Sequence, residues 1–160
     1  MSILKTYSLD WEVNDPIFDF NLLGFKTCIN KDYDFVFYLN KNCKFNFKRV
    51  NDQQIIEDGI TYIFSIYRFF HEKTKQKLEL ISNFSFPQTI HENDSFFDQI
   101  EKVKILIPEY KYYNYFLKSD VILDEEFYIN LGNLKNIYKF SEINIDKIKI
   151  KNLENLILPT

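Results

Sequence analysis

Apolar and polar residues alternate along several stretches of the chain, a pattern typical of β-strands with one buried face. The clearest stretch spans residues 77–86. Its apolar side carries Leu78, Leu80, Phe84 and Phe86. Its polar side carries Lys77, Glu79, Asn83 and Ser85. We expect the apolar set to be buried and Lys77, Glu79 and Asn83 to be exposed, with Pro87 ending the strand.

Further strands are predicted on either side of this one. The first begins at Phe18, with Leu22 on the same side and Gly24 as a candidate bulge. Residues 60–70 are apolar on both sides, which indicates a central strand, and the polar residues 51–59 form a connection before it. The remaining predicted strands are 44–50, 103–107, 112–117 and 137–140.

Residues 30–42 have the spacing of an amphipathic helix. Asn30 is the expected N-cap, and the charges that suit the helix dipole are Asp32 and Asp34 in the first turn and Lys41 in the last. Val36, Leu39 and Cys43 share one face. The alternation around Asp34 also fits a strand, but the charge pattern favours the helix.

A second helix is predicted after Asp120 or Asp124, with Gly132 as its C-terminal stop. Its apolar stripe consists of Leu123, Phe127, Leu131 and Leu134.

The 160 residues contain no repeat and no linker rich in Pro or Gly. We therefore expect a single α+β domain over 1–160, an antiparallel sheet with about two helices packed mainly on one face. Residues 1–15 are expected to form an extended arm and residues 88–99 a mobile loop. The chain has no apolar run of membrane-spanning length and no signal-peptide pattern, so a cytoplasmic location without membrane attachment is predicted.

Catalytic and cofactor motifs are missing from the sequence. It has only three glycines, and none belongs to a phosphate loop. Cys28 and Cys43 lack the spacing of a zinc site and are expected to be reduced thiols, while His71 and His91 stand apart from them. We expect no enzyme activity, no cofactor and no metal.

The distribution of charge along the chain indicates one further candidate site. The formal net charge is −3, but residues 135–151 are rich in lysine and carry only Glu142 and Asp146 as acids. Its lysines are Lys135, Lys139, Lys147, Lys149 and Lys151. A solvated surface is the favoured interpretation, and a surface that follows nucleic-acid phosphates is the alternative.

Residues 107–115 read Ile-Pro-Glu-Tyr-Lys-Tyr-Tyr-Asn-Tyr, which resembles the signature of the bacterial IPExxxVDY family. Ile107, Pro108, Glu109 and Tyr115 match that signature, whereas Tyr113 and Asn114 replace its Val and Asp. The resemblance implies one cytoplasmic domain without an established activity. Members of the family are often encoded beside ribonuclease III, which keeps an RNA-linked role open.

The motif residues also have a physical interpretation. Pro108 cannot continue an interior strand, so we expect it at an edge or a corner, with Ile107 anchored in the core. The Glu109 carboxylate can accept hydrogen bonds from backbone N–H groups there, and Tyr115 is expected to pack across the same corner. A folding device is favoured over a binding site.

The predicted function is a non-enzymatic binding module with a protein partner, because the chain is rich in aromatic residues and has no catalytic constellation. The alternative is an RNA-associated accessory factor that uses the C-terminal lysines and exposed tyrosines.

Overall fold

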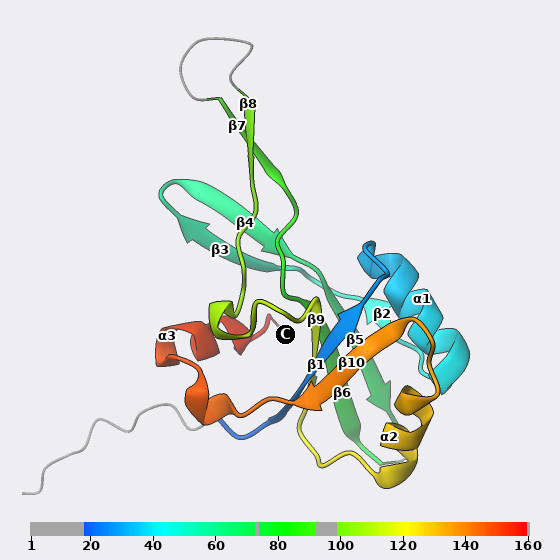
Figure 1. Cartoon of the computed structure of the whole chain (residues 1–160). Helices are drawn as coiled ribbons and strands as arrows, with labels where there is room; N and C mark the ends of the chain where they lie inside the picture. Colours follow the sequence, from blue (N-terminus) through cyan, green and yellow to red (C-terminus); the bar gives the residue numbers. More distant parts are fainter. Residues whose placement is uncertain (1–17, 73, 92–98, 160) are drawn as a thin grey trace, which may run out of the picture.

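A six-stranded antiparallel sheet with strand order β10-β1-β9-β6-β5-β2 lies at the centre of the computed structural model (Figure 1). The structure describes residues 18–72, 74–91 and 99–159. The predicted arm, 1–15, lies outside these residues. The sheet consists of β1 (Asn21–Thr27), β2 (Lys48–Arg49), β5 (Ile66–His71), β6 (Gln76–Ser82), β9 (Tyr115–Ser119) and β10 (Ile137–Glu142). The predicted α+β class is confirmed.

Two hairpins project from one end of this sheet (Figure 1). One pairs β3 (Gln53–Glu57) with β4 (Ile60–Phe64), and the other pairs β7 (Gln88–His91) with β8 (Gln99–Lys102). The prediction of a loop over 88–99 is therefore wrong at both ends, and residues 92–98 lie outside the described part. No helix in the described part is long and apolar enough to cross a bilayer.

The two longer helices, α1 (Asp32–Cys43) and α2 (Glu125–Gly132), cover one face of the sheet, here called the helix face. Their buried Phe35, Leu39 and Leu131 pack on sheet residues such as Leu23 and Leu117. The packing of both helices on one face is thus confirmed.

Helix ends follow the predicted charge pattern more closely than the predicted caps. Asp124 caps α2 by accepting a hydrogen bond of 2.8 Å from the N–H of Phe127, as expected. In α1 the N-cap is Lys31, without a side-chain cap, so the prediction of Asn30 is wrong. The carbonyl of Asn30 instead accepts a hydrogen bond from the Tyr115 hydroxyl.

The opposite face, here called the loop face, is covered by strand β4, short helices and the irregular segments between them. Its cover consists of β4, residues 106–113, η1 (Pro108–Tyr110), η2 (Ile145–Lys147), α3 (Ile150–Leu153) and η3 (Glu154–Leu156). Neighbouring residues therefore bury opposite sides of the same strand: Leu23 and Leu117 face the helices, and Leu22 and Phe116 face the loops.

Burial on both faces corrects the prediction for 77–86. Leu78 and Leu80 are buried on the helix face, as predicted. Glu79 and Asn83 were expected in solvent but are 2% and 0% exposed, because the polar side of this segment meets the second layer. The strand ends at Ser82, and beyond it Phe86 is 38% exposed.

The segment 51–70 also differs from its prediction. Residues 60–70 are two strands that separate at Ser65, β4 in a hairpin and β5 in the main sheet, and the predicted connection 51–59 contains β3. Only Lys48 and Arg49 of 44–50 form a strand. Phe47 instead exchanges two hydrogen bonds with the side-chain amide of Asn40, which takes the place of a ladder partner.

Three further predictions change near the hairpins and β1. Gly24 pairs regularly, and the irregularity lies between Lys26 and Thr27. In the predicted strand 103–107 the structure has a single bridge, from Ile105 to Phe84. Strand 112–117 shifts to β9, and strand 137–140 extends to Glu142.

Candidate functional site

The first three motif residues form a corner on the loop face. Ile107 is fully buried and Pro108 opens the 3-10 helix η1, as expected of a core anchor and a corner proline. The N–H of Ile107 donates to Oδ1 of the buried Asn83 over 3.0 Å.

Asn83 holds the backbone of this corner in place. Its Nδ2 donates to the carbonyls of Tyr110 (3.2 Å) and Tyr113 (2.9 Å), and its own carbonyl accepts from the N–H of Leu106 (2.8 Å). Periodicity placed Asn83 in solvent because it cannot show that a second layer covers this face.

Glu109 ties the corner to the C-terminal helix α3. Its Oε1 accepts hydrogen bonds of 2.9 Å from the N–H of Lys149 and from Nδ2 of Asn152. Desolvation alone would raise the pKa of the Glu109 carboxyl, but these hydrogen bonds hold it below its usual value. The prediction that Glu109 bonds N–H groups of its own corner is corrected here: the backbone donor is Lys149, the N-cap of α3, 40 residues along the chain.

Tyr115 does not join this corner. Its ring stacks on Phe35 of α1 with 4.5 Å between ring centroids, and its hydroxyl donates to the carbonyls of Ile29 and Asn30 at 3.4 Å. The expectation that Tyr115 packs across the corner is wrong, since on β9 it is Phe116 that faces the loop side. Burial raises the pKa of the Tyr115 hydroxyl, which stays protonated.

The five C-terminal lysines are all exposed but occupy different elements. Lys135 precedes β10, Lys139 lies within β10, and Lys147 belongs to η2. Lys149 is the N-cap of α3, and Lys151 lies inside that helix. The structure thus distributes them instead of gathering them on one strand or helix.

A recess with a volume of about 440 Å³ lies where α1 begins, beside the start of β9. We call it the aromatic recess, because four aromatic side chains line it together with serines and amides. Its residues are Asn30, Lys31, Asp32, Tyr33, Ser65, Ser82, Phe84, Ser85, Phe86, Pro87, Asn114 and Tyr115. Tyr33 is 54% exposed, so the recess has an open aromatic rim.

An ion network stiffens one wall of the aromatic recess. Oδ2 of Asp32 accepts hydrogen bonds of 3.1 Å from Nη1 of Arg49 and from the Tyr67 hydroxyl. The Arg49 guanidinium lies over the rings of Tyr67 (5.2 Å) and Phe86 (5.6 Å), and Nε donates to Asp52 over 2.9 Å. These contacts fix Phe86 and leave its outer side open to a ligand.

A compositional signal for this network exists in the sequence. The chain has 18 lysines and only two arginines, Arg49 and Arg68. Arg49 makes its hydrogen-bonded ion pair in this network, and Arg68 makes one with Glu79 on the loop face. Arg is the residue suited to such fixed, multivalent contacts. The two arginines could therefore have been selected as anchors from the sequence.

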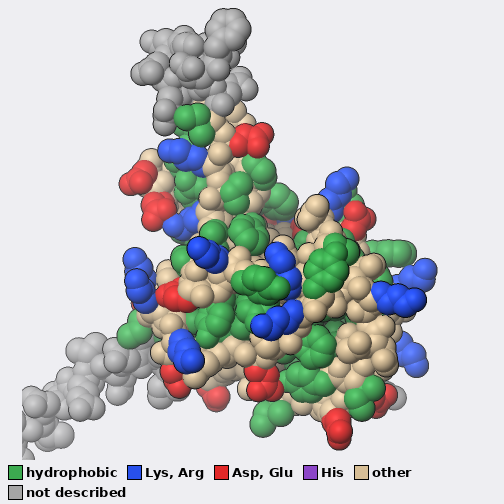
Figure 2. Space-filling view, viewed as in Figure 1, with side chains coloured by type: hydrophobic (Ala, Val, Ile, Leu, Met, Phe, Trp, Pro, Cys, Tyr) green, Lys and Arg blue, Asp and Glu red, His purple; other side chains and the backbone are tan. Residues whose placement is uncertain are grey.

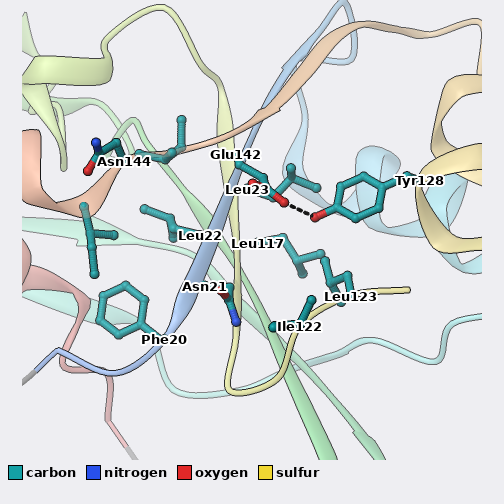
Figure 3. A pocket seen from close by; sticks show the side chains of 12 residues that line it. Phe20, Asn21, Leu22, Leu23, Leu117, Ile122, Leu123, Tyr128, Glu142 and Asn144 are labelled. Carbon is teal, nitrogen blue, oxygen red and sulfur yellow. Dashed lines mark hydrogen bonds between the residues drawn. The ribbon is translucent and has the colours of Figure 1, made fainter. Parts of the chain in front are cut away.

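A second, smaller cavity of about 260 Å³ lies at the ends of β1 and β10, next to α2 (Figure 3). The Tyr128 hydroxyl points toward β10 and donates to Oε1 of Glu142 over 2.8 Å. Burial, and then this hydrogen bond, raises the pKa of Tyr128 to about 12. The described residues that line this cavity include no His, Cys, Ser or Lys.

Metal and thiol chemistry have no assembled site in residues 18–72, 74–91 and 99–159. No three His, Cys, Asp or Glu residues converge there in a way that could hold a metal ion. Cys28 and Cys43 are free, and burial raises the pKa of the Cys43 thiol, which disfavours the reactive thiolate.

Comparison with known proteins gives no relative: no family model, curated protein or solved structure matches the chain.

Proposed function

We propose that the protein is a cytoplasmic, non-enzymatic binding module that contacts another protein through the aromatic recess. The observation that carries the proposal is the open aromatic rim, formed by Tyr33 and by Phe86, whose ring is held by Arg49. Aromatic side chains and Arg are enriched at protein interfaces, where rigid rings bury a large area at low entropic cost.

The recess favours an extended polypeptide segment that carries an apolar or aromatic side chain. The rings of Tyr33 and Phe86 supply apolar contact, and Ser85 and Asn114 supply polar atoms at the recess wall. The Nδ2 of Asn114 donates to no other described residue, so this donor is free for a backbone carbonyl of a partner.

The proposal is tested with a recess variant, Tyr33→Ser with Phe86→Ser. Its matched control, Ile56→Ser with Ile129→Ser, removes two exposed apolar side chains from other surfaces. A protein captured from native extract with the wild-type chain is purified and titrated by calorimetry. We expect the recess variant to weaken binding at least tenfold and the control less than twofold, with similar unfolding midpoints for both. Equal binding by both variants would overturn the recess as the interface.

The alternative is an RNA-associated accessory factor that contacts phosphates through the C-terminal lysines. It predicts an affinity for RNA that falls steeply as salt rises and that is lost when Lys147 and Lys149 are replaced by Gln. The protein-binding proposal predicts that this variant binds the captured protein as the wild type does. The resemblance of residues 107–115 to the IPExxxVDY family remains a prediction. The Asn83 and Glu109 contacts support its interpretation as a folding device.

A further inference from the structure

Two lysines and one tyrosine meet on the loop-face surface, here called the lysine–tyrosine cluster. Lys26 of β1 and Lys139 of β10 are direct cross-strand partners. Their ammonium groups lie 5.2 and 5.7 Å from the centroid of the Tyr112 ring. Figure 2 shows basic side chains beside hydrophobic ones in the middle of the face where β1 and β10 lie.

The charges of the cluster are not balanced by the protein. Like charges directly opposite each other on adjacent strands are destabilising. Within the described residues, neither Lys26 nor Lys139 forms an ion pair with a carboxylate. Lys111, next to Tyr112, is also exposed. A bound anion would relieve the repulsion and bridge the two strands.

The tyrosine ring is both open and held in place. Tyr112 is 53% exposed and packs edge-on against Tyr113, with ring centroids 5.5 Å apart. Tyr113 is buried, and its hydroxyl is hydrogen-bonded to Ser141 of β10. Two cations lie over this ring, and its exposed side offers a stacking surface for a planar group that carries negative charge.

We propose that the lysine–tyrosine cluster binds a nucleotide unit of a single-stranded nucleic acid, with its base on Tyr112 and its phosphate between Lys26 and Lys139. An open ring can stack on a base but cannot enclose a free nucleotide. A strand also provides further phosphates within reach of Lys111. The cluster shares no residue with the aromatic recess, so this inference stands or falls separately from the protein-binding proposal.

Fluorescence anisotropy of the full chain with a labelled twelve-residue oligouridylate tests the site. The variants are Lys26→Gln with Lys139→Gln, and Tyr112→Leu, with Tyr112→Trp to retain a stacking ring. The control, Lys41→Gln with Lys48→Gln, makes the same change in net charge at exposed lysines that belong to neither the cluster nor the C-terminal lysines. Unlabelled inorganic polyphosphate and uridine monophosphate serve as competitors.

We expect the Lys26/Lys139 variant to bind the oligonucleotide at least tenfold more weakly and the control variant less than twofold. For the Lys26/Lys139 variant, the slope of log affinity against log salt concentration should become shallower by about 0.7 for each phosphate contact removed. Tyr112→Leu should weaken oligonucleotide binding about fivefold or more, leave polyphosphate binding unchanged, and be rescued by Tyr112→Trp.

Four outcomes would overturn the inference. Equal losses in the cluster and control variants would mean attraction by overall charge alone. Insensitivity to Tyr112→Leu would mean a plain phosphate site. Competition by uridine monophosphate as strong as by the oligonucleotide would mean a free-nucleotide site. Absence of binding at low salt would mean no anion site. The recess variant, Tyr33→Ser with Phe86→Ser, should bind the oligonucleotide as the wild type does, because the two sites share no residue.

Discussion

The two faces of the central sheet are buried by different means. On the helix face, α1 and α2 contribute apolar side chains, and the core cluster there consists of aromatic and aliphatic residues. On the loop face the cover is made of short helices, strand β4 and irregular segments, which bury a second apolar cluster and are also held by buried polar groups. A helix satisfies its own backbone hydrogen bonds, whereas an irregular segment needs partners from elsewhere.

The loop face supplies such partners through Asn83 and Glu79. Asn83 bonds the backbone of the motif corner. Glu79 lies between Arg68 and Lys118 on neighbouring strands, with Oε1 2.7 Å from Nη2 of Arg68 and Oε2 3.6 Å from Nζ of Lys118. Those two cations also donate to carbonyls of residues 156 and 159 and so fix the C-terminal segment. The loop face is thus specified by a few polar residues, each with several partners.

The largest effect is expected from a cavity on the helix face. Phe35→Ala should lower the free energy of unfolding by about 3–5 kcal/mol, since its ring is fully buried against Tyr115 and Phe25. Phe37→Ala on the same helix, where the ring is exposed, is the matched control and should change it by less than about 0.5 kcal/mol. Urea titrations measure both, and similar losses would contradict the assigned faces.

Glu79→Gln should be the most damaging polar substitution on the loop face. It leaves Arg68 and Lys118 without their counter-charge, at a cost of about 3 kcal/mol. This value is at the low end for buried pairs because the two cations are 23% and 18% exposed. Glu101→Gln, an exposed glutamate of β8, is the control. A loss below 1 kcal/mol in urea titration would show that apolar contacts alone hold this face.

Asn83→Ala should lower the free energy of unfolding by about 2–3 kcal/mol. The substitution leaves the N–H of Ile107 and the carbonyls of Tyr110 and Tyr113 without their hydrogen-bond partner. Hydrogen exchange should show faster exchange at residues 107–113 and unchanged protection in α1. Asn51→Ala, at an exposed position, should leave both stability and exchange unchanged. Uniform acceleration over the two faces would argue against a local role for Asn83.

Gly24→Ala should destabilise the protein by about 1–2 kcal/mol through overpacking. A Cβ at this position would lie 2.8 Å from Cγ of Tyr113, whose ring is buried and tethered to Ser141. Gly132→Ala, where a Cβ meets no atom within 4 Å, should instead stabilise α2 slightly. Thermal melts of the two variants should shift in opposite directions.

The smallest effect is expected from Glu109→Gln, about 0.5–1 kcal/mol near neutral pH, since the carboxylate is exposed. The pKa of the Glu109 carboxyl is lower in the folded state than its usual value. The ionised carboxylate therefore stabilises the folded state at pH values above the unfolded pKa, and this stabilisation is lost as pH falls through the folded pKa. The difference from wild type should therefore vanish under acidic conditions. A pH-independent difference would mean that the carboxylate charge is not involved.

Combining Glu109→Gln with Tyr115→Phe compares the two faces directly. Because Glu109 bonds α3 and Tyr115 packs on α1, their effects should add within about 0.5 kcal/mol. A larger coupling energy would indicate that the motif acts as one unit.

Local patterns in the sequence determined the α+β class, the two longer helices and the buried Leu78 and Leu80, because helix charges and apolar periodicity depend on neighbours within one or two turns. They also identified Ile107 as a core residue and Pro108 as a corner. For the candidate sites they identified Lys139 and the exposed tyrosines in general, but not Lys26, which lies more than 100 residues from its cross-strand partner.

Tertiary structure alone decided which polar residues are buried and which surfaces exist. The alternation that marks Glu79 and Asn83 as polar is the same whether water or a second layer covers them, so their burial depends on residues 106–113 and 145–156. The aromatic recess likewise joins segments from α1, the end of β6 and the start of β9. Such surfaces arise from contacts between distant segments, and the periodicity of each segment carries no information on which other segment it will meet.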